Sequence, residues 1–150
     1  MEVYRIVHSK WSTTLNASGY AARWNSNGVF IIYTAENCSL ACLENLVHRN
    51  GFGLDSDFNL LTVTIPNSVK TIELKQSDLS KGWNDLSEKG HLICRSIGDN
   101  WIKNQQYAIM IVPSAIIINE KNVLINPNHP DFKKIKFSKQ AFIFDKRLIK

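Results

Sequence analysis

Three residues between positions 19 and 48 carry side chains that could act together on a phosphate-bearing substrate. Arg23 lies in a polar segment, Tyr33 ends an apolar run, and Glu44 falls within an amphipathic segment. A guanidinium fork suits bidentate phosphate binding, an aromatic ring packs on a planar group, and a carboxylate stabilises developing positive charge. The sequence therefore predicts a candidate site supplied by one loop, one strand and one helix.

Each of these residues also has a simpler explanation. Arg23 could be a surface arginine lying over the neighbouring Trp24 ring. Tyr33 could be a core ring whose hydroxyl reaches the rim, and Glu44 could be an exposed acid at the margin of the helix's apolar stripe. That predicted stripe consists of Leu40, Leu43, Leu46 and Val47. The residue pattern alone leaves both interpretations open.

Ser114 is a fourth candidate, placed after Pro113 at the end of an apolar segment. Serine at a strand end usually satisfies backbone groups, and no GxSxG motif surrounds it, which disfavours a hydrolase nucleophile. The four histidines lack metal-ligand spacing, so we predict no metal site. The absence of GxxxxGK[ST] and GxGxxG motifs disfavours P-loop and Rossmann nucleotide binding.

The elements that would position these residues follow from periodicity and turn signals. Alternation predicts a strand at residues 2–8, turn formers predict a long loop at 10–28, and a β-branched and aromatic run predicts a strand at 29–34. Asn37 or Ser39 could cap a helix that ends near Asn50, where Gly51 supplies a stop signal.

The second half of the chain is dominated by predicted strands. We expect strands at residues 58–65, 69–74 and 106–112, a helix at 92–103, a hairpin formed by 115–118 and 123–126, a rigid turn at 127–130, and closing strands at 133–137 and 141–144. Strands outnumber helices at least two to one and do not alternate with them regularly. The expected fold is α+β, a single domain over residues 1–150 with mixed or antiparallel sheets and a few helices.

Composition is typical of a soluble globular protein. The chain has 150 residues, of which 44% are hydrophobic and 21% charged, and no apolar run is long enough to span a membrane. The N-terminus lacks the apolar core of a signal peptide, so we expect a cytoplasmic protein. Three cysteines without CxxC spacing predict buried free thiols: Cys38, Cys42 and Cys94.

Positive charge is concentrated at the C-terminal end. Residues 131–150 contain seven Lys or Arg and two Asp, which accounts for the whole net charge of +5. Such a basic segment could bind an acidic protein or a nucleic acid. Alternatively, its lysines could protect a solvated edge strand from pairing with other chains.

Six short motifs, in order along the chain, resemble the RES domain family. They are YRI (4–6), RWNSNG (23–28), YTAE (33–36), LENLVH (43–48), VPSA (112–115) and NPNHPDF (126–132). The arginine, glutamate and serine that name the family correspond to Arg23, Glu44 and Ser114, and Tyr33 matches its usual tyrosine. The chain departs from the family before Arg23, where Ala21-Ala22 replaces two glycines and the segment is shorter.

This resemblance implies an ADP-ribosyltransferase-like fold and the toxin of a bacterial type II toxin–antitoxin system. The implied activity consumes NAD as a substrate, with no tightly bound cofactor, by hydrolysis or phosphorolysis of the nicotinamide–ribose bond or by ADP-ribosylation of a protein. Glu44 would stabilise the oxocarbenium-like ribose and Arg23 would clamp the diphosphate, while Tyr33 and Ser114 would contact the substrate. Arg5 and Asn126 are further candidates for the cleft wall.

The implied partner is an Xre-type helix-turn-helix antitoxin, docked through the basic C-terminal region, with DNA bound only indirectly and no membrane association. A rival from another class is a basic nucleic-acid or partner-binding module, or an RNA-directed toxin, acting through residues 133–150.

Overall fold

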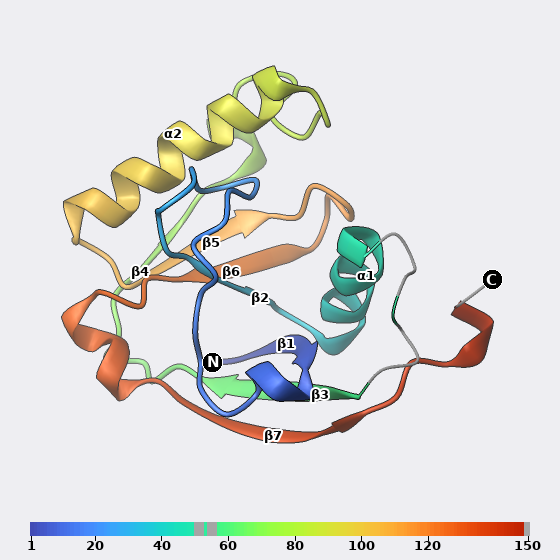
Figure 1. Cartoon of the computed structure of the whole chain (residues 1–150). Coiled ribbons are helices and arrows are strands. Elements are labelled where there is room, and N and C mark those ends of the chain that lie inside the picture. Colours follow the sequence, from blue (N-terminus) through green and yellow to red (C-terminus); the bar gives the residue numbers. More distant parts are fainter. Residues whose placement is uncertain (50–52, 54–56, 149–150) are drawn as a thin grey trace.

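Seven strands form one mixed sheet in the computed structural model, which describes residues 1–49, 53 and 57–148 (Figure 1). The strand order is β4-β5-β6-β2-β1-β3-β7, and every pair is antiparallel except β4 with β5. The predicted α+β class with a mixed sheet is confirmed. The strands are β1 (Glu2–His8), β2 (Ile32–Ala35), β3 (Phe58–Thr64), β4 (Thr71–Glu73), β5 (Ile109–Pro113), β6 (Lys121–Ile125) and β7 (Lys136–Phe142).

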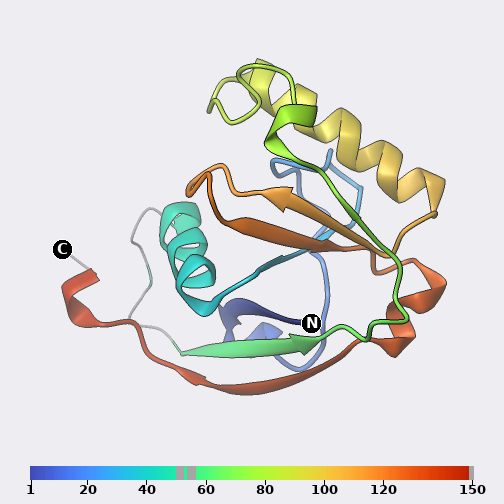
Figure 2. The same ribbon diagram turned by 180° about the vertical axis from the view of Figure 1, so that it is seen from behind.

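Both α-helices of the described chain pack on the same face of this sheet, which we call the helix face. In β1, Ile6 packs in the cluster that includes Leu40 of α1 (Cys38–Arg49). In β6, Leu124 packs in the cluster that includes Trp101 of α2 (Glu88–Asn104). Figures 1 and 2 show α2 over β4–β6, with α1 set apart from it beside β1 and β2. The candidate residues carried by the part of the sheet under α1 and by the part under α2 therefore meet between the two helices.

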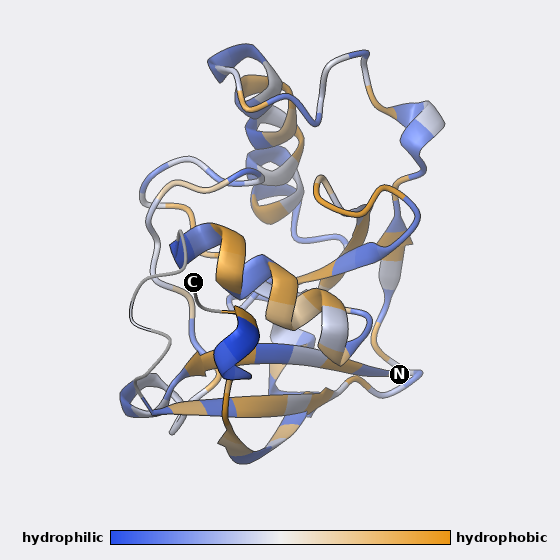
Figure 3. Cartoon of the chain, turned by 90° about the vertical axis from the view of Figure 1, so that its right-hand side faces the viewer, coloured by the Kyte–Doolittle hydropathy of each residue, from blue (hydrophilic) through white to orange (hydrophobic). Residues whose placement is uncertain are grey.

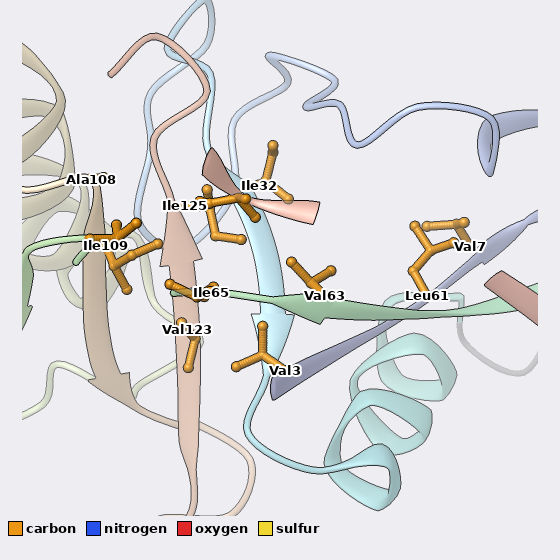
Figure 4. Close-up of a cluster of buried hydrophobic side chains, with 12 residues drawn as sticks. Val3, Val7, Ile32, Leu61, Val63, Ile65, Ala108, Ile109, Val123 and Ile125 are labelled. Atoms are coloured by element: carbon orange, nitrogen blue, oxygen red, sulfur yellow. The ribbon is translucent and has the colours of Figure 1, made fainter. Parts of the chain in front are cut away.

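The opposite face of the sheet holds the largest apolar cluster. Alternate residues of the strands point here, so Val3 of β1, Val63 of β3 and Val123 of β6 are almost completely buried together. The sheet curves enough that side chains from β1 and β3 lie against those from β5 and β6 (Figure 4). Residues of the 10–28 loop cover this cluster, so we call this side the loop face.

The helices begin where the sequence provides caps. The Asn37 Oδ1 atom accepts from Leu40 N at 2.7 Å, which makes Asn37 the N-cap of α1. Ser87 caps α2 in the same way, so this helix begins four residues earlier than predicted. Both helices mix hydrophilic and hydrophobic residues (Figure 3). Of the predicted α1 stripe, Val47 is exposed instead of buried; the predicted end at residues 50–51 lies outside the described residues.

Strand β2 begins three residues later than predicted because its first residues belong to the preceding loop. The side chain of Asn25 donates to the Val29 carbonyl, and Val29 N donates to Ser26 O. These hydrogen bonds fold residues 25–29 into a turn, so their backbone does not extend the hydrogen-bonded ladder of β2. The same loop also bends at Gly28, whose φ of 85° favours glycine.

The predicted hairpin of residues 115–118 with 123–126 is wrong. Strand β6 pairs with β5 instead, with Pro113 opposite Lys121, and Ser114 N donates to Glu120 O across the connection. Residues 114–120 form the connecting turn. Strands β4 and β5 are also shorter at their N-terminal ends than predicted.

The basic C-terminal segment forms a short 3-10 helix, Pro130–Lys134, and then β7, which is an edge strand of the sheet. Lys136 and Lys139 of β7 are exposed, as expected for lysines that protect an edge. This arrangement leaves the partner-binding alternative open. Within the described ranges, no helix is both long enough and apolar enough to cross a membrane.

Candidate active site around Glu44

The carboxylate of Glu44 is the centre of a polar cluster on the helix face. Its Oε1 atom accepts hydrogen bonds from Asn122 Nδ2 at 2.7 Å and from Ser114 Oγ at 3.3 Å. Its Oε2 atom lies 3.6 Å from Nε2 of His48, one helical turn further along α1. Strand β6, the turn after β5 and helix α1 thus converge on a single carboxylate whose side chain is 21% exposed.

These contacts keep Glu44 ionised. Burial alone raises the pKa of the carboxyl group, because the charged form loses hydration. The contacts with His48, Asn122 and Ser114 outweigh burial and place the pKa below its ordinary value of 4.5. Glu44 is therefore a carboxylate at neutral pH, suited to stabilising positive charge rather than to donating a proton.

The lowered pKa predicts how the contribution of Glu44 to stability depends on pH. A carboxyl group whose pKa is lower in the folded state stabilises the fold above its unfolded pKa and loses that contribution as the pH falls through its folded pKa. The difference between the free energies of unfolding of wild type and Glu44→Gln should therefore shrink as the pH falls below about 5.5. Urea titrations between pH 3 and 7 would measure this, and a difference that grows on acidification would contradict it.

Ser114 serves both the backbone and Glu44. Its hydroxyl donates to Glu44 and accepts from the backbone N–H groups of Ile116 and Ile117, both at 3.1 Å. The residue is completely buried. Its position is therefore that of a support for Glu44 and for the turn after β5, rather than of a group open to solvent.

Tyr33 organises the loop that carries Arg23. Its hydroxyl accepts from Trp24 N at 3.0 Å and donates to Asn25 Oδ1 at 2.6 Å. Asn25 is buried and in turn donates to the carbonyls of Tyr20 and Val29. Burial raises the pKa of Tyr33, so the hydroxyl keeps its proton and its donor role.

A Tyr33→Phe variant should be less stable by about 1–3 kcal/mol, because Trp24 N and Asn25 Oδ1 each lose a partner in a partly buried site. Urea unfolding would measure the loss. Tyr20→Phe is the matched control, since Tyr20 is 77% exposed and should tolerate the same change. Equal stability of the two variants would contradict the proposed role of the Tyr33 hydroxyl.

Arg23 is held by backbone carbonyls. Its Nη1 atom donates to Trp83 O at 2.9 Å and to Asp85 O at 3.2 Å, in the segment that leads into α2. The cation–π contacts found among the described residues involve other pairs, so Arg23 does not lie over Trp24 as the simpler interpretation suggested. The guanidinium is thus fixed by neutral acceptors and not by a carboxylate.

Strand register brings the two halves of the site together. Tyr33 lies opposite Leu124, and Ala35 lies opposite Asn122, so Tyr33 and Asn122 are diagonal neighbours on the helix face. Diagonal neighbours on adjacent strands are about 7–8 Å apart. Tyr33 and Asn122 therefore lie between the Arg23 loop, which Tyr33 contacts, and Glu44, which Asn122 contacts.

Arg5 and Asn126 are not brought to Glu44. Arg5 shares the loop face of β1 with Val3 and Val7, donates to Asn16 O, and has a pKa lowered to about 10 by burial. Asn126 is completely buried and lies four residues beyond Asn122, or about 13 Å along the strand direction. The structure places both residues away from the predicted cleft.

Two residues at the site were not predicted from the sequence. His48 was detectable, because a residue four positions after Glu44 on a helix lies on the same side. Asn122 was not, because it reaches Glu44 only through the β5–β6 register. The three cysteines are free; Cys94 is buried as predicted, whereas Cys38 and Cys42 are half-buried. No group of three or more potential metal ligands occurs within the described ranges.

Comparison with known families decides the classification, since the model of the RES domain matches residues 2–146. The chain belongs to the RES domain family. As a RES domain it is similar over 131 residues to the Prs ADP-ribosylating toxin of a Sphingobium species, with 39% identity across 85% of this chain and 80% of the relative. It is also 35% identical to proteins named Toxin Res from Yersinia enterocolitica and Photorhabdus laumondii, with at least 98% of each chain covered.

Proposed function

We propose that this RES domain is a toxin that cleaves the bond between nicotinamide and ribose in NAD. The observation that carries the proposal is the Glu44 carboxylate, whose pKa is lowered by His48, Asn122 and Ser114, on the same face of the sheet as Tyr33, which bonds the loop that carries Arg23. A relative named as an ADP-ribosylating toxin supports chemistry on an ADP-ribose donor.

The reaction requires one bond to break and one to form. The bond between C1′ of the ribose and the nicotinamide nitrogen breaks, and nicotinamide leaves with the electron pair, which neutralises its pyridinium charge. Positive charge develops on the ribose, where the Glu44 carboxylate stabilises it. An acceptor oxygen then bonds to C1′ and releases a proton, while Arg23 holds the diphosphate.

Free nicotinamide measured after incubation of the purified protein with NAD tests this proposal. We expect release that depends on the protein and that increases with its concentration. Adding phosphate distinguishes the two reactions by their products. Phosphorolysis gives ADP-ribose with a phosphate on C1′ of the ribose that carried nicotinamide, whereas hydrolysis gives ADP-ribose itself. Absence of nicotinamide with and without phosphate would disprove the NAD-cleaving function.

Transfer of ADP-ribose to a protein is the second candidate, favoured by the name of the Sphingobium relative. It shares the same first step and differs only in the acceptor. NAD labelled in its adenylate moiety, incubated with the protein in a bacterial lysate, separates the two. Label that enters protein supports transfer, whereas label recovered only in small molecules supports hydrolysis or phosphorolysis.

We further propose that an Xre-type antitoxin binds the basic C-terminal region. Exposed lysines on edge strand β7, including Lys136 and Lys139, support an acidic partner there. Because β7 is part of the sheet, charge reversal of these two lysines is a cleaner test than deletion. Loss of the complex with retained NAD cleavage would support docking, whereas salt-sensitive RNA binding by the isolated protein would favour the nucleic-acid alternative.

A further inference from the structure

One side of α2 is pressed against the loop that carries Arg23. A Cβ atom added at Gly98 would lie 1.8 Å from the carbonyl oxygen of Trp24, so the two backbones are in direct contact. One turn earlier, Arg95 Nε donates to Ala22 O at 2.9 Å. This side of α2 therefore forms a wall beside Arg23, and the residues spaced along it face the same space.

Three basic side chains gather at this wall. Burial, and then the charges of Arg23 and Arg95, lower the pKa of His91, which lies four residues before Arg95 on α2. The three groups are thus close enough to repel added positive charge. None of the ion pairs in the described part of the chain includes Arg23 or Arg95. The carboxylate of Asp99 on the same helix is engaged by the N–H and hydroxyl of Ser26.

The guanidinium groups also keep donors available. Arg95 uses Nε on a carbonyl, and among the described residues no acceptor is found for its two terminal nitrogens. Arg23 donates from Nη1 to two carbonyls, and its guanidinium also lies beside the thiol of Cys94. Neighbouring like charges that belong to none of the ion pairs found in the described residues are unfavourable in the free protein, and an anion with several oxygens would relieve them.

We propose that Arg95 and His91 form, together with Arg23, a binding site for a diphosphate. The proposal rests on the proposed function for the identity of the dinucleotide, but the anion site itself does not depend on bond cleavage. Two guanidinium forks on adjoining elements match two linked phosphate groups, and His91 supplies a further donor. The rest of the dinucleotide would then extend across Tyr33 toward Glu44 on the helix face.

Calorimetric titration with ADP-ribose, AMP and adenosine tests the site without catalysis, because none of the three carries nicotinamide. Wild type should bind ADP-ribose more tightly than AMP, and AMP more tightly than adenosine. Arg95→Gln should weaken ADP-ribose binding by roughly 10-fold or more, and His91→Ala by a smaller factor. Both variants should leave the affinity for adenosine unchanged.

Lys103→Gln is the matched control, since it removes one positive charge from an exposed position in the last turn of α2. It should leave ADP-ribose binding nearly unchanged. The side chain of His91 makes no hydrogen bond among the described residues, and its backbone N–H donates to Ser87 O, so His91→Ala is the variant least able to disturb the loop. Thermal unfolding of each variant checks that the fold is retained.

The inference is overturned if Arg95→Gln and His91→Ala bind ADP-ribose as wild type does, if they weaken adenosine equally, or if wild type does not bind ADP-ribose. Its failure is distinguishable from that of the proposed function. If wild type releases nicotinamide from NAD and both variants bind ADP-ribose normally, the diphosphate site is disproved and NAD cleavage is not. If the variants show the expected binding pattern but wild type releases no nicotinamide, NAD cleavage is disproved and the diphosphate site is not.

Discussion

Replacing Glu44 by Gln should reduce nicotinamide release from NAD by about 100-fold or more, with the fold retained. The amide is nearly the same size as the carboxylate, and its oxygen can still accept from Asn122 and Ser114, which both converge on Oε1. Its NH2 group can face His48, where Oε2 lies now. What the variant loses is the negative charge, which the developing positive charge on the ribose requires.

Glu36→Gln provides a matched control for that result. Glu36 is exposed just beyond β2, and its Oε1 accepts from Lys121 N at 2.7 Å. The Glu36→Gln substitution therefore makes the same chemical change next to β6 but leaves the residues around Glu44 untouched. We expect near-wild-type activity from this variant. Full activity in Glu44→Gln, measured as the initial rate of nicotinamide release, would remove Glu44 from the mechanism.

The grouping of Glu44 with Ser114 illustrates what the sequence could and could not predict. Motifs in order along the chain placed both residues in one site, and their hydrogen bond agrees with that placement. The motifs could not predict that Asn122 would supply the shorter hydrogen bond. That contact depends on the turn after β5, where apolar residues 115–118 resembled a strand by composition but became a turn because Ser114 and Glu120 close it.

Arg5 is a second example of a position that the sequence pattern does not fully predict. The alternation that predicts a strand at residues 2–8 also puts Val3, Arg5 and Val7 on one side of it, and the structure agrees. Periodicity does not specify which side of a strand the helices cover. That choice is made by tertiary packing, which places α1 against Ile6 and sends Arg5 to the loop face.

The close contact between α2 and the Arg23 loop predicts a second large effect, from Gly98→Ala. In most helices this substitution is stabilising, by up to about 1 kcal/mol. At position 98 the added methyl group would lie 1.8 Å from the Trp24 carbonyl oxygen and 2.9 Å from its carbonyl carbon, and these are backbone atoms that cannot rotate away. Either α2 or the loop must move, and Arg23 moves with the loop.

We therefore expect Gly98→Ala to destabilise the protein by about 1–3 kcal/mol, which corresponds to roughly 2–4 °C in Tm per kcal/mol for a chain of this size. Because Trp24 N is also bonded to the Tyr33 hydroxyl, displacement of the loop should lower NAD cleavage as well. Ser96→Ala, at an exposed position on the same helix, is the control and should change neither quantity appreciably. A Gly98→Ala protein with the Tm and activity of wild type would show that α2 does not hold the loop, because the substitution cannot be accommodated while this contact is intact.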